Sequence, residues 1–122
     1  MTFPRGYAEA LSGFFLFITC GAGMSFERIM ALEVSDDAIY QQYREHMTPI
    51  LHSFGGSFGF DLKVSEVLKS KTNTAINRVF TIDFPSKDVM EAFFTDPAYL
   101  AVKDKYFNRS VASVTTISLH EK

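Results

Sequence analysis

The stretch HSFGGSFGFD, from His52 to Asp61, decides the fold. A helical spacing of apolar residues stops at two adjacent glycines, Gly55 and Gly56, and phenylalanine then alternates with glycine and aspartate. One glycine can adopt the left-handed conformation that ends a helix, and the other lets the chain turn back sharply. Alternation with a period of two is typical of a β-strand. The stretch therefore predicts a helix, a tight reversal and a strand.

The same two periods extend in both directions along the chain. Alternating residues predict four strands, at residues 26–34, 57–64, 75–84 and 110–121. Apolar residues spaced by three and four predict two helices, with Ser35 and Ser86 as their N-caps and a restart of the second at Asp96-Pro97. In the second strand, Phe58, Phe60, Leu62 and Val64 are expected on one face and Gly59, Asp61 and Lys63 on the other.

The predicted order β-α-β-β-α-β is that of the ferredoxin-like α+β fold, a four-stranded antiparallel sheet with both helices on one face. Such a sheet leaves its second face bare, and here both faces of the strands carry apolar residues. A large apolar patch is unusual on a soluble monomer. We therefore expect a homodimer formed through the open sheet face, which should display several of the following residues: Met30, Phe58, Phe60, Phe80 and Phe84.

The composition excludes several classes of function. The 122 residues are 47% hydrophobic and 21% charged with a net charge of −2, and no basic stripe supports nucleic-acid binding. No apolar run is long enough to span a bilayer as a helix. No phosphate-binding or dinucleotide motif and no Cys/His spacing predicts a cofactor or a metal. The single Cys20 cannot form an intramolecular disulfide, which suggests a cytoplasmic location.

Residues 1–24 are predicted to be an extension that precedes a single domain at residues 25–122. Their apolar run, LSGFFLFIT, has the length of a signal peptide, but Glu9 and the weak basic region before it fit that interpretation poorly. Two alternatives stay open, namely a mis-annotated start with Met24 as the true first residue, and a segment that packs on the domain. Export is therefore not excluded by the sequence.

Three segments carry a resemblance to a known family. They are YQQYREHMTPILHSFGG (40–56), NRVFTIDFPS (77–86) and FFTDPAYLAVKDKY (93–106). In this order and spacing they resemble the domain of unknown function 1330 family, of the dimeric α+β barrel superfamily that also contains the antibiotic-biosynthesis monooxygenases. The resemblance runs from about residue 26 to residue 121. It implies a homodimer with facing sheets and no established activity.

Four residues are candidates for ligand binding: Arg78, Asp61, Tyr43 and His52. Arg78 lies on an apolar strand face, where a guanidinium needs a carboxylate partner. An ion pair with Asp61 or Asp83 is favoured over an anchor for a ligand carboxylate or enolate. Tyr43 can present its phenol to a cleft between helix and sheet, and Asp61 can line a small pocket beside Gly59. His52 lies at a helix C-terminus, which favours a structural role over that of a catalytic base.

No residue pattern identifies a catalytic group, so the sequence leaves three functions open. The first is a dimer that binds a small organic molecule. The second is a cofactor-independent monooxygenase or isomerase, which rests on analogy within the superfamily alone. The third is a structural or interaction module without a ligand. The sequence does not decide whether the protein is an enzyme.

Overall fold

The computed structural model describes residues 25–122, so the predicted extension at residues 1–24 lies outside the described residues. The elements follow the predicted order and are listed here with their bounds: β2 (Phe26–Val34), α1 (Asp37–Ser53), β3 (Ser57–Lys63), β4 (Arg78–Phe84), α2 (Lys87–Thr95), α3 (Pro97–Val102), the π-helical turn η2 (Lys103–Phe107), α4 (Asn108–Ser110) and β5 (Val111–Glu121). The predicted α+β class and the ferredoxin-like order are confirmed.

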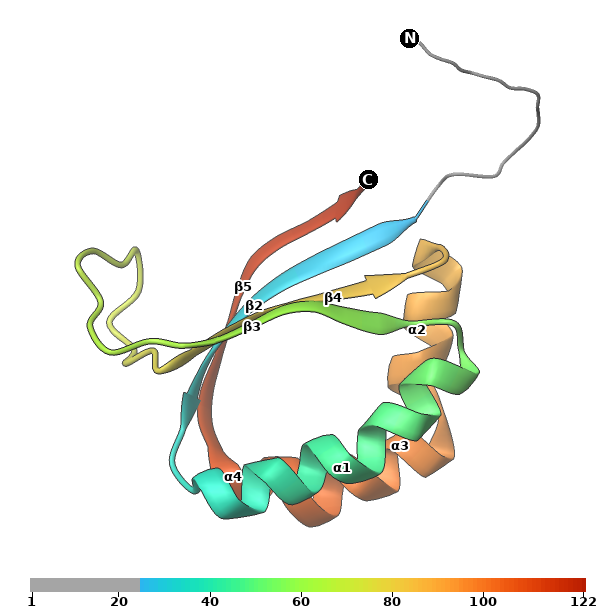
Figure 1. The fold of residues 1–122 in the computed structure, drawn as a ribbon, viewed down its shortest axis with the longest axis horizontal. Coiled ribbons are helices and arrows are strands. Elements are labelled where there is room, and N and C mark those ends of the chain that lie inside the picture. The colour runs from blue at the N-terminus through green and yellow to red at the C-terminus, as the bar shows by residue number, and fades with distance from the viewer. Residues whose placement is uncertain (1–24) are drawn as a thin grey trace, which may run out of the picture.

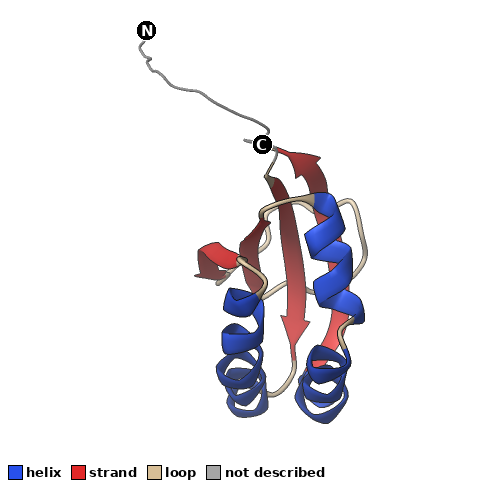
Figure 2. Cartoon of the chain, turned by 90° about the vertical axis from the view of Figure 1, so that its right-hand side faces the viewer, coloured by secondary structure: helices blue, strands red, loops and turns tan. Residues whose placement is uncertain are grey.

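The four strands form one antiparallel sheet in the order β3-β4-β2-β5. The helices drawn in Figure 1 all lie on one side of this sheet, with α1 and α3 running below the strands. Figure 2 shows the same two layers from the side, with the helices in front of the strands. The fold therefore has a helix-covered face and an open face of the sheet.

The reversal between α1 and β3 uses both glycines. Gly55 has a φ of 79°, the left-handed conformation that the sequence predicts for a helix end. The Gly56 N–H donates to the carbonyl of Leu51 at 3.0 Å. A Cβ atom added to Gly56 would lie 2.5 Å from Leu51 Cδ1, so no larger residue fits without a shift of the core.

The first helix begins one residue later than the sequence predicts. Asp36, not Ser35, is the N-cap, because its carboxylate accepts a hydrogen bond from the Ile39 N–H at 3.1 Å. Ser35 instead donates its N–H to the carbonyl of Ser110 at 2.7 Å, which ties the start of α1 to the start of β5. The predicted caps Ser86 and Asp96 are confirmed for α2 and α3.

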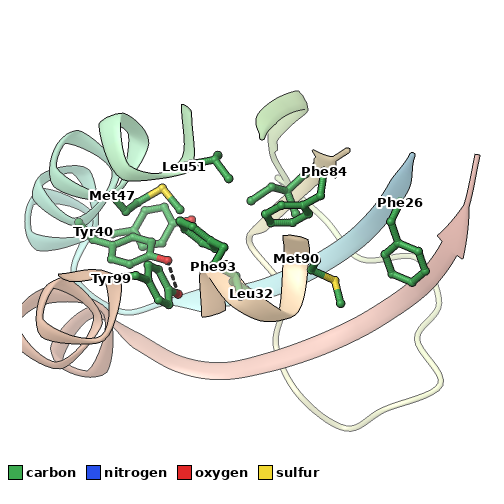
Figure 3. Close-up of a cluster of buried hydrophobic side chains, with 11 residues drawn as sticks. Phe26, Leu32, Tyr40, Met47, Leu51, Phe84, Met90, Phe93 and Tyr99 are labelled. Carbon is green, nitrogen blue, oxygen red and sulfur yellow. Dashed lines mark hydrogen bonds between the residues drawn. The ribbon is translucent and has the colours of Figure 1, made fainter. Parts of the chain in front are cut away.

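The hydrophobic core lies between the sheet and the helices, as Figure 3 shows for its largest members. Phe84 and Ile82 of β4 and Leu32 of β2 contribute from the sheet, with 1%, 2% and 1% of their surface exposed. Phe93 of α2 and Tyr40 of α1 are both fully buried against them. Burial of such side chains contributes about 2–3 kcal/mol each before the cost of ordering them.

A β-bulge in β3 changes which residues face the helices. Phe58 pairs with Ile82 and Asp61 pairs with Phe80, so the two residues between these pairs on β3 lie opposite one residue of β4. The prediction that Phe58 shares a strand face with Phe60 and Leu62 is therefore wrong. The extra residue turns Asp61 to the helix side, while Leu62 is 54% exposed on the opposite side.

The set predicted for the open sheet face is also largely wrong. Met30 and Phe84 are buried, and Phe58 and Phe80 pack against the core on the helix side. Of the five residues, only Phe60 is highly exposed, at 69%. Strand alternation predicts two apolar faces but cannot decide which of them the helices cover.

Candidate ligand-binding site

A cavity of about 430 Å³ separates part of the sheet from the helices. Natural ligand pockets start at roughly 300 Å³, so the space is large enough for a small organic molecule. The lining residues come from every layer of the fold and are Arg28, Met30, Leu32, Tyr40, Tyr43, Arg44, Met47, Phe58, Phe80, Ile82, Phe94, Tyr99, Lys103, Phe107 and Val114.

Strand alternation and helical spacing in the sequence direct these side chains into the cavity. Arg28, Met30 and Leu32 alternate along β2, so all three point from one face of the strand toward the helices. Tyr40 and Met47 lie two turns apart on α1 and point to the sheet from one face of the helix. The cavity is therefore lined by rigid elements rather than by loops.

Two tyrosines form a buried hydrogen bond at the cavity wall. The hydroxyl of Tyr43 lies 2.9 Å from that of Tyr99, and Figure 3 marks the bond with a dashed line. Burial raises the pKa of Tyr43 well above its ordinary value, and burial also raises the pKa of Tyr99. Both phenols are therefore neutral near pH 7. One hydrogen joins the pair, which leaves the second hydroxyl hydrogen free for another acceptor.

Arg44 of α1 enters the cavity between aromatic rings. Its guanidinium lies 3.9 Å from the centre of the Phe58 ring, and its Nε donates to the Tyr40 hydroxyl at 3.0 Å. Its Nη2 lies 3.1 Å from Asp61 Oδ1, although the orientation falls outside hydrogen-bond geometry. Stacking on aromatic faces and the ion pair together stabilise this guanidinium in a largely buried position.

The predicted ion pair of Arg78 is confirmed, with Asp61 as the partner. Arg78 donates from Nε to Oδ1 at 2.9 Å and from Nη2 to Oδ2 at 3.0 Å, a bidentate arrangement. Burial raises the pKa of Asp61, but the hydrogen bonds from Arg78 and the charges of Arg44 and Arg78 outweigh burial and lower it. Asp61 thus joins two arginines at the outer side of the cavity, and neither Asp61 nor Arg78 lines it.

Arg28 of the central strand β2 has no such partner. Within residues 25–122 it forms no ion pair, and its buried Nε donates no hydrogen bond. Its guanidinium lies 4.3 Å from the centre of the Phe94 ring, and burial lowers its pKa. An arginine remains charged even when burial lowers its pKa, so the wall of the cavity holds a cation that no residue among 25–122 compensates.

The turn η2 places two further residues at the cavity. The N–H of Asn108 donates to the carbonyl of Lys103 five residues earlier, which widens the helix by one residue. Lys103 and Phe107, at the two ends of this turn, both line the cavity. The sequence predicts only a continuous helix here, so this turn was missed.

The structure brings together some of the predicted site residues and not others. Tyr43 lines the cavity and Asp61 with Arg78 forms its outer ion pair, but His52 is exposed on α1 and does not reach it. Arg28, Arg44 and Lys103, which all line the cavity, were missed. One signal was present for Arg28, a charged residue in register with Met30 and Leu32 on an apolar strand face. No group of histidine, cysteine and acidic residues in the described part of the chain could hold a metal ion.

No helix among residues 25–122 is long and apolar enough to cross a membrane.

Comparison with known proteins gives a family and a fold. The model of the family described as Domain of unknown function (DUF1330) matches residues 28–119. A protein of unknown function from Rhodopseudomonas palustris has a similar structure, with a TM-score of 0.70 at 14% identity over 82% of this chain and 83% of that one. No curated protein sequence matches the chain.

Two further structures share the fold at lower similarity. A dimeric protein of unknown function with a ferredoxin-like fold, from Bacteroides fragilis, gives a TM-score of 0.54 at 14% identity, over 80% of this chain and 96% of that one. A candidate antibiotic biosynthesis monooxygenase from Nitrosomonas europaea gives 0.54 at 11% identity, over 82% and 91%. At such identities the similarity establishes the fold alone.

Proposed function

This protein belongs to the DUF1330 family, whose description assigns no activity, and we propose from the geometry of the cavity that it binds a small organic molecule. The observation that carries the proposal is the 430 Å³ space between sheet and helices. Protein interiors contain few voids larger than a water molecule. A cavity of this size, with aromatic walls and three cationic side chains, has the composition of a ligand site.

Binding is better supported than catalysis. None of the residues that line the cavity is an aspartate, a glutamate or a histidine, the groups that most often act as general bases. The phenols that line it have raised pKa values and are poor bases in their neutral form. The similarity to the Nitrosomonas europaea protein extends to the fold, so a monooxygenase or isomerase activity has no observation of its own here.

We expect the neutral fluorophore N-phenyl-1-naphthylamine to bind in the cavity and to lose that binding when the lining is filled. Val114 is 49% exposed on β5 and lines the cavity, so a tryptophan there would fill part of the space. Val114→Trp should lower the affinity for the fluorophore by about tenfold or more. Ile117→Trp is the matched control, because Ile117 is 55% exposed on the same strand and does not line the cavity. Fluorescence titration measures both. If the two variants bind the fluorophore with equal affinity, the cavity is not the binding site.

We also propose that two copies associate through their open sheet faces. Leu62 and Val79 are paired across β3 and β4 and point away from the helices, because their neighbours Asp61 and Phe80 point toward them. Ile29 extends this apolar surface on β2. The Bacteroides fragilis structure of the same fold is described as dimeric, which supports a homodimer here. The two-fold arrangement would bury one surface against its copy.

Three expectations from the sequence stay predictions. They are the cytoplasmic location, the independence from a cofactor, and the status of residues 1–24 as an extension of the domain. The intact mass and absorbance spectrum of protein purified from its source check the last two.

A further inference from the structure

On the basis of the proposed binding function, we propose that the cavity takes an amphipathic anion. This would be an apolar or aromatic body that carries one carboxylate or a similar monoanionic group, with the charge held by Arg28. Three features of the site carry the inference: the charge balance of its lining, the unused donors at one part of its wall, and the aromatic surface elsewhere.

The cavity lining is positively charged. Arg28, Arg44 and Lys103 line it, and no acidic residue does. Arg44 is compensated by Asp61 at 3.1 Å. Within residues 25–122, neither Arg28 nor Lys103 forms an ion pair. A bound anion would supply the charge that the described residues lack.

Arg28 is built to act as an anchor rather than as a mobile surface cation. Its backbone belongs to β2, which is hydrogen-bonded to β4 on one side and to β5 on the other. Phe94 covers its guanidinium at 4.3 Å, and its Nε is shielded from solvent without a hydrogen-bond acceptor. A guanidinium in this state has planar donors ready for an oxyanion, and little side-chain entropy remains to be lost on binding.

The Tyr43–Tyr99 pair supplies a second donor in the same region of the cavity. Phe94, whose ring centre lies 4.3 Å from the Arg28 guanidinium, packs against Tyr99 with ring centres 5.4 Å apart, so Arg28 and Tyr99 lie in the same region. The pair uses one of its two hydroxyl hydrogens internally, at 2.9 Å. The remaining hydrogen can be donated to an anion, and a neutral phenol does not repel it.

The rest of the lining fits an apolar body. Phe58 and Phe80 pack edge to face with ring centres 5.5 Å apart, and Met47 and Ile82 complete an apolar wall. Arg44 lies over the Phe58 ring but is already paired with Asp61, so a ligand held by this wall would direct its charge toward Arg28. A small inorganic anion would leave that apolar wall unused.

Two fluorophores with one skeleton test this inference. N-phenyl-1-naphthylamine is neutral, and 8-anilino-1-naphthalenesulfonate is the same ring system with one sulfonate. We expect the sulfonate to bind the unmodified protein at least about tenfold more tightly than the neutral compound, because it gains charge-assisted hydrogen bonds. Arg28→Met should lower the ratio of the sulfonate affinity to the neutral-compound affinity by at least about tenfold, while Arg28→Lys should restore part of that ratio.

The control is Lys105→Met, which removes the same charge from an exposed residue that does not line the cavity and should leave both affinities unchanged. Equal affinity of the unmodified protein for the two fluorophores would overturn the anion inference while leaving the proposed function intact. Failure of both to bind would overturn the proposed function itself. Because the first comparison uses the unmodified protein, it decides the matter even if Arg28→Met does not fold.

Discussion

Leu62→Glu should convert the proposed homodimer into a monomer at micromolar concentration. Leu62 is 54% exposed on the edge strand β3, so the charge costs the isolated protomer little. In a two-fold assembly each interface would receive two carboxylates, one from each copy, against the apolar surface formed with Val79 and Ile29. Desolvation of these carboxylates should weaken association by about two orders of magnitude or more. Sedimentation equilibrium measures the change.

The matched control for this substitution is Leu68→Glu, in the connection between β3 and β4. Leu68 is 89% exposed and lies outside the strands, so the same chemical change should leave the dimer intact. A monomeric unmodified protein, or a dimer that survives Leu62→Glu, would contradict the proposed interface. Phe80→Glu is unsuitable as a test, because Phe80 lines the cavity rather than the open face.

Asp61→Ala should lower the free energy of unfolding by about 2 kcal/mol. Asp61 is the common partner of Arg44 and Arg78, whose side chains are each only 11% exposed. Removal of the carboxylate takes the shared partner away from two largely buried guanidinium groups. Breaking a fully buried ion pair in this way lowers stability by about 3–5 kcal/mol. The smaller value expected here reflects the 31% exposure of the Asp61 side chain, which lets solvent screen the charges.

Urea unfolding at fixed protein concentration measures this effect. Asp37→Ala is the control, since Asp37 also lies near Arg78, at 3.6 Å, but is 64% exposed and should contribute less than about 0.5 kcal/mol. If both variants unfold at the same urea concentration as the parent, the ion-pair cluster does not stabilise the fold.

The pH dependence of the free energy of unfolding is a second measure of how much the Asp61 ion pair stabilises the fold. The pKa of Asp61 is lower in the folded protein than its ordinary value of 3.8, so the folded state favours the ionised form. The contribution of the ionised Asp61 to stability is fully present when the pH is above the ordinary pKa. It is lost as the pH falls through the lower pKa of the folded protein. The difference in stability between the parent and Asp61→Ala should therefore shrink below about pH 4. A difference that stays constant on acidification would contradict this assignment.

Much of the fold could be predicted because it depends on the spacing of apolar and polar residues within short segments of the chain. The alternation of β2 and β4, the apolar spacing of α1 and the caps Ser86 and Asp96 all follow from residues near one another in the chain. A left-handed glycine at the end of α1 was predictable for the same reason, although the choice of Gly55 over Gly56 was not. The pair of Arg78 with an acid also followed, from the cost of an unpaired guanidinium on an apolar face.

The parts that failed depend on pairing between distant segments. The bulge in β3 lies between Phe58 and Asp61, and the alternation of residues along the strand carries no information about its pairing register. The position of Asp61 beside Arg44 follows from the bulge and could not be predicted without it. The cavity depends on how far α1 and η2 stand from the sheet, which tertiary packing decides. Lys103 was missed for this reason.

The central claim is that the space between sheet and helices binds a small organic molecule, and methionine methyl NMR tests it most directly. Met30 and Met47 line the cavity, whereas Met90 is buried in the same core without lining it. Titration of the unmodified protein with N-phenyl-1-naphthylamine should shift the methyl signals of Met30 and Met47 and leave that of Met90 in place. Unchanged signals for Met30 and Met47 at saturating fluorophore would contradict the claim.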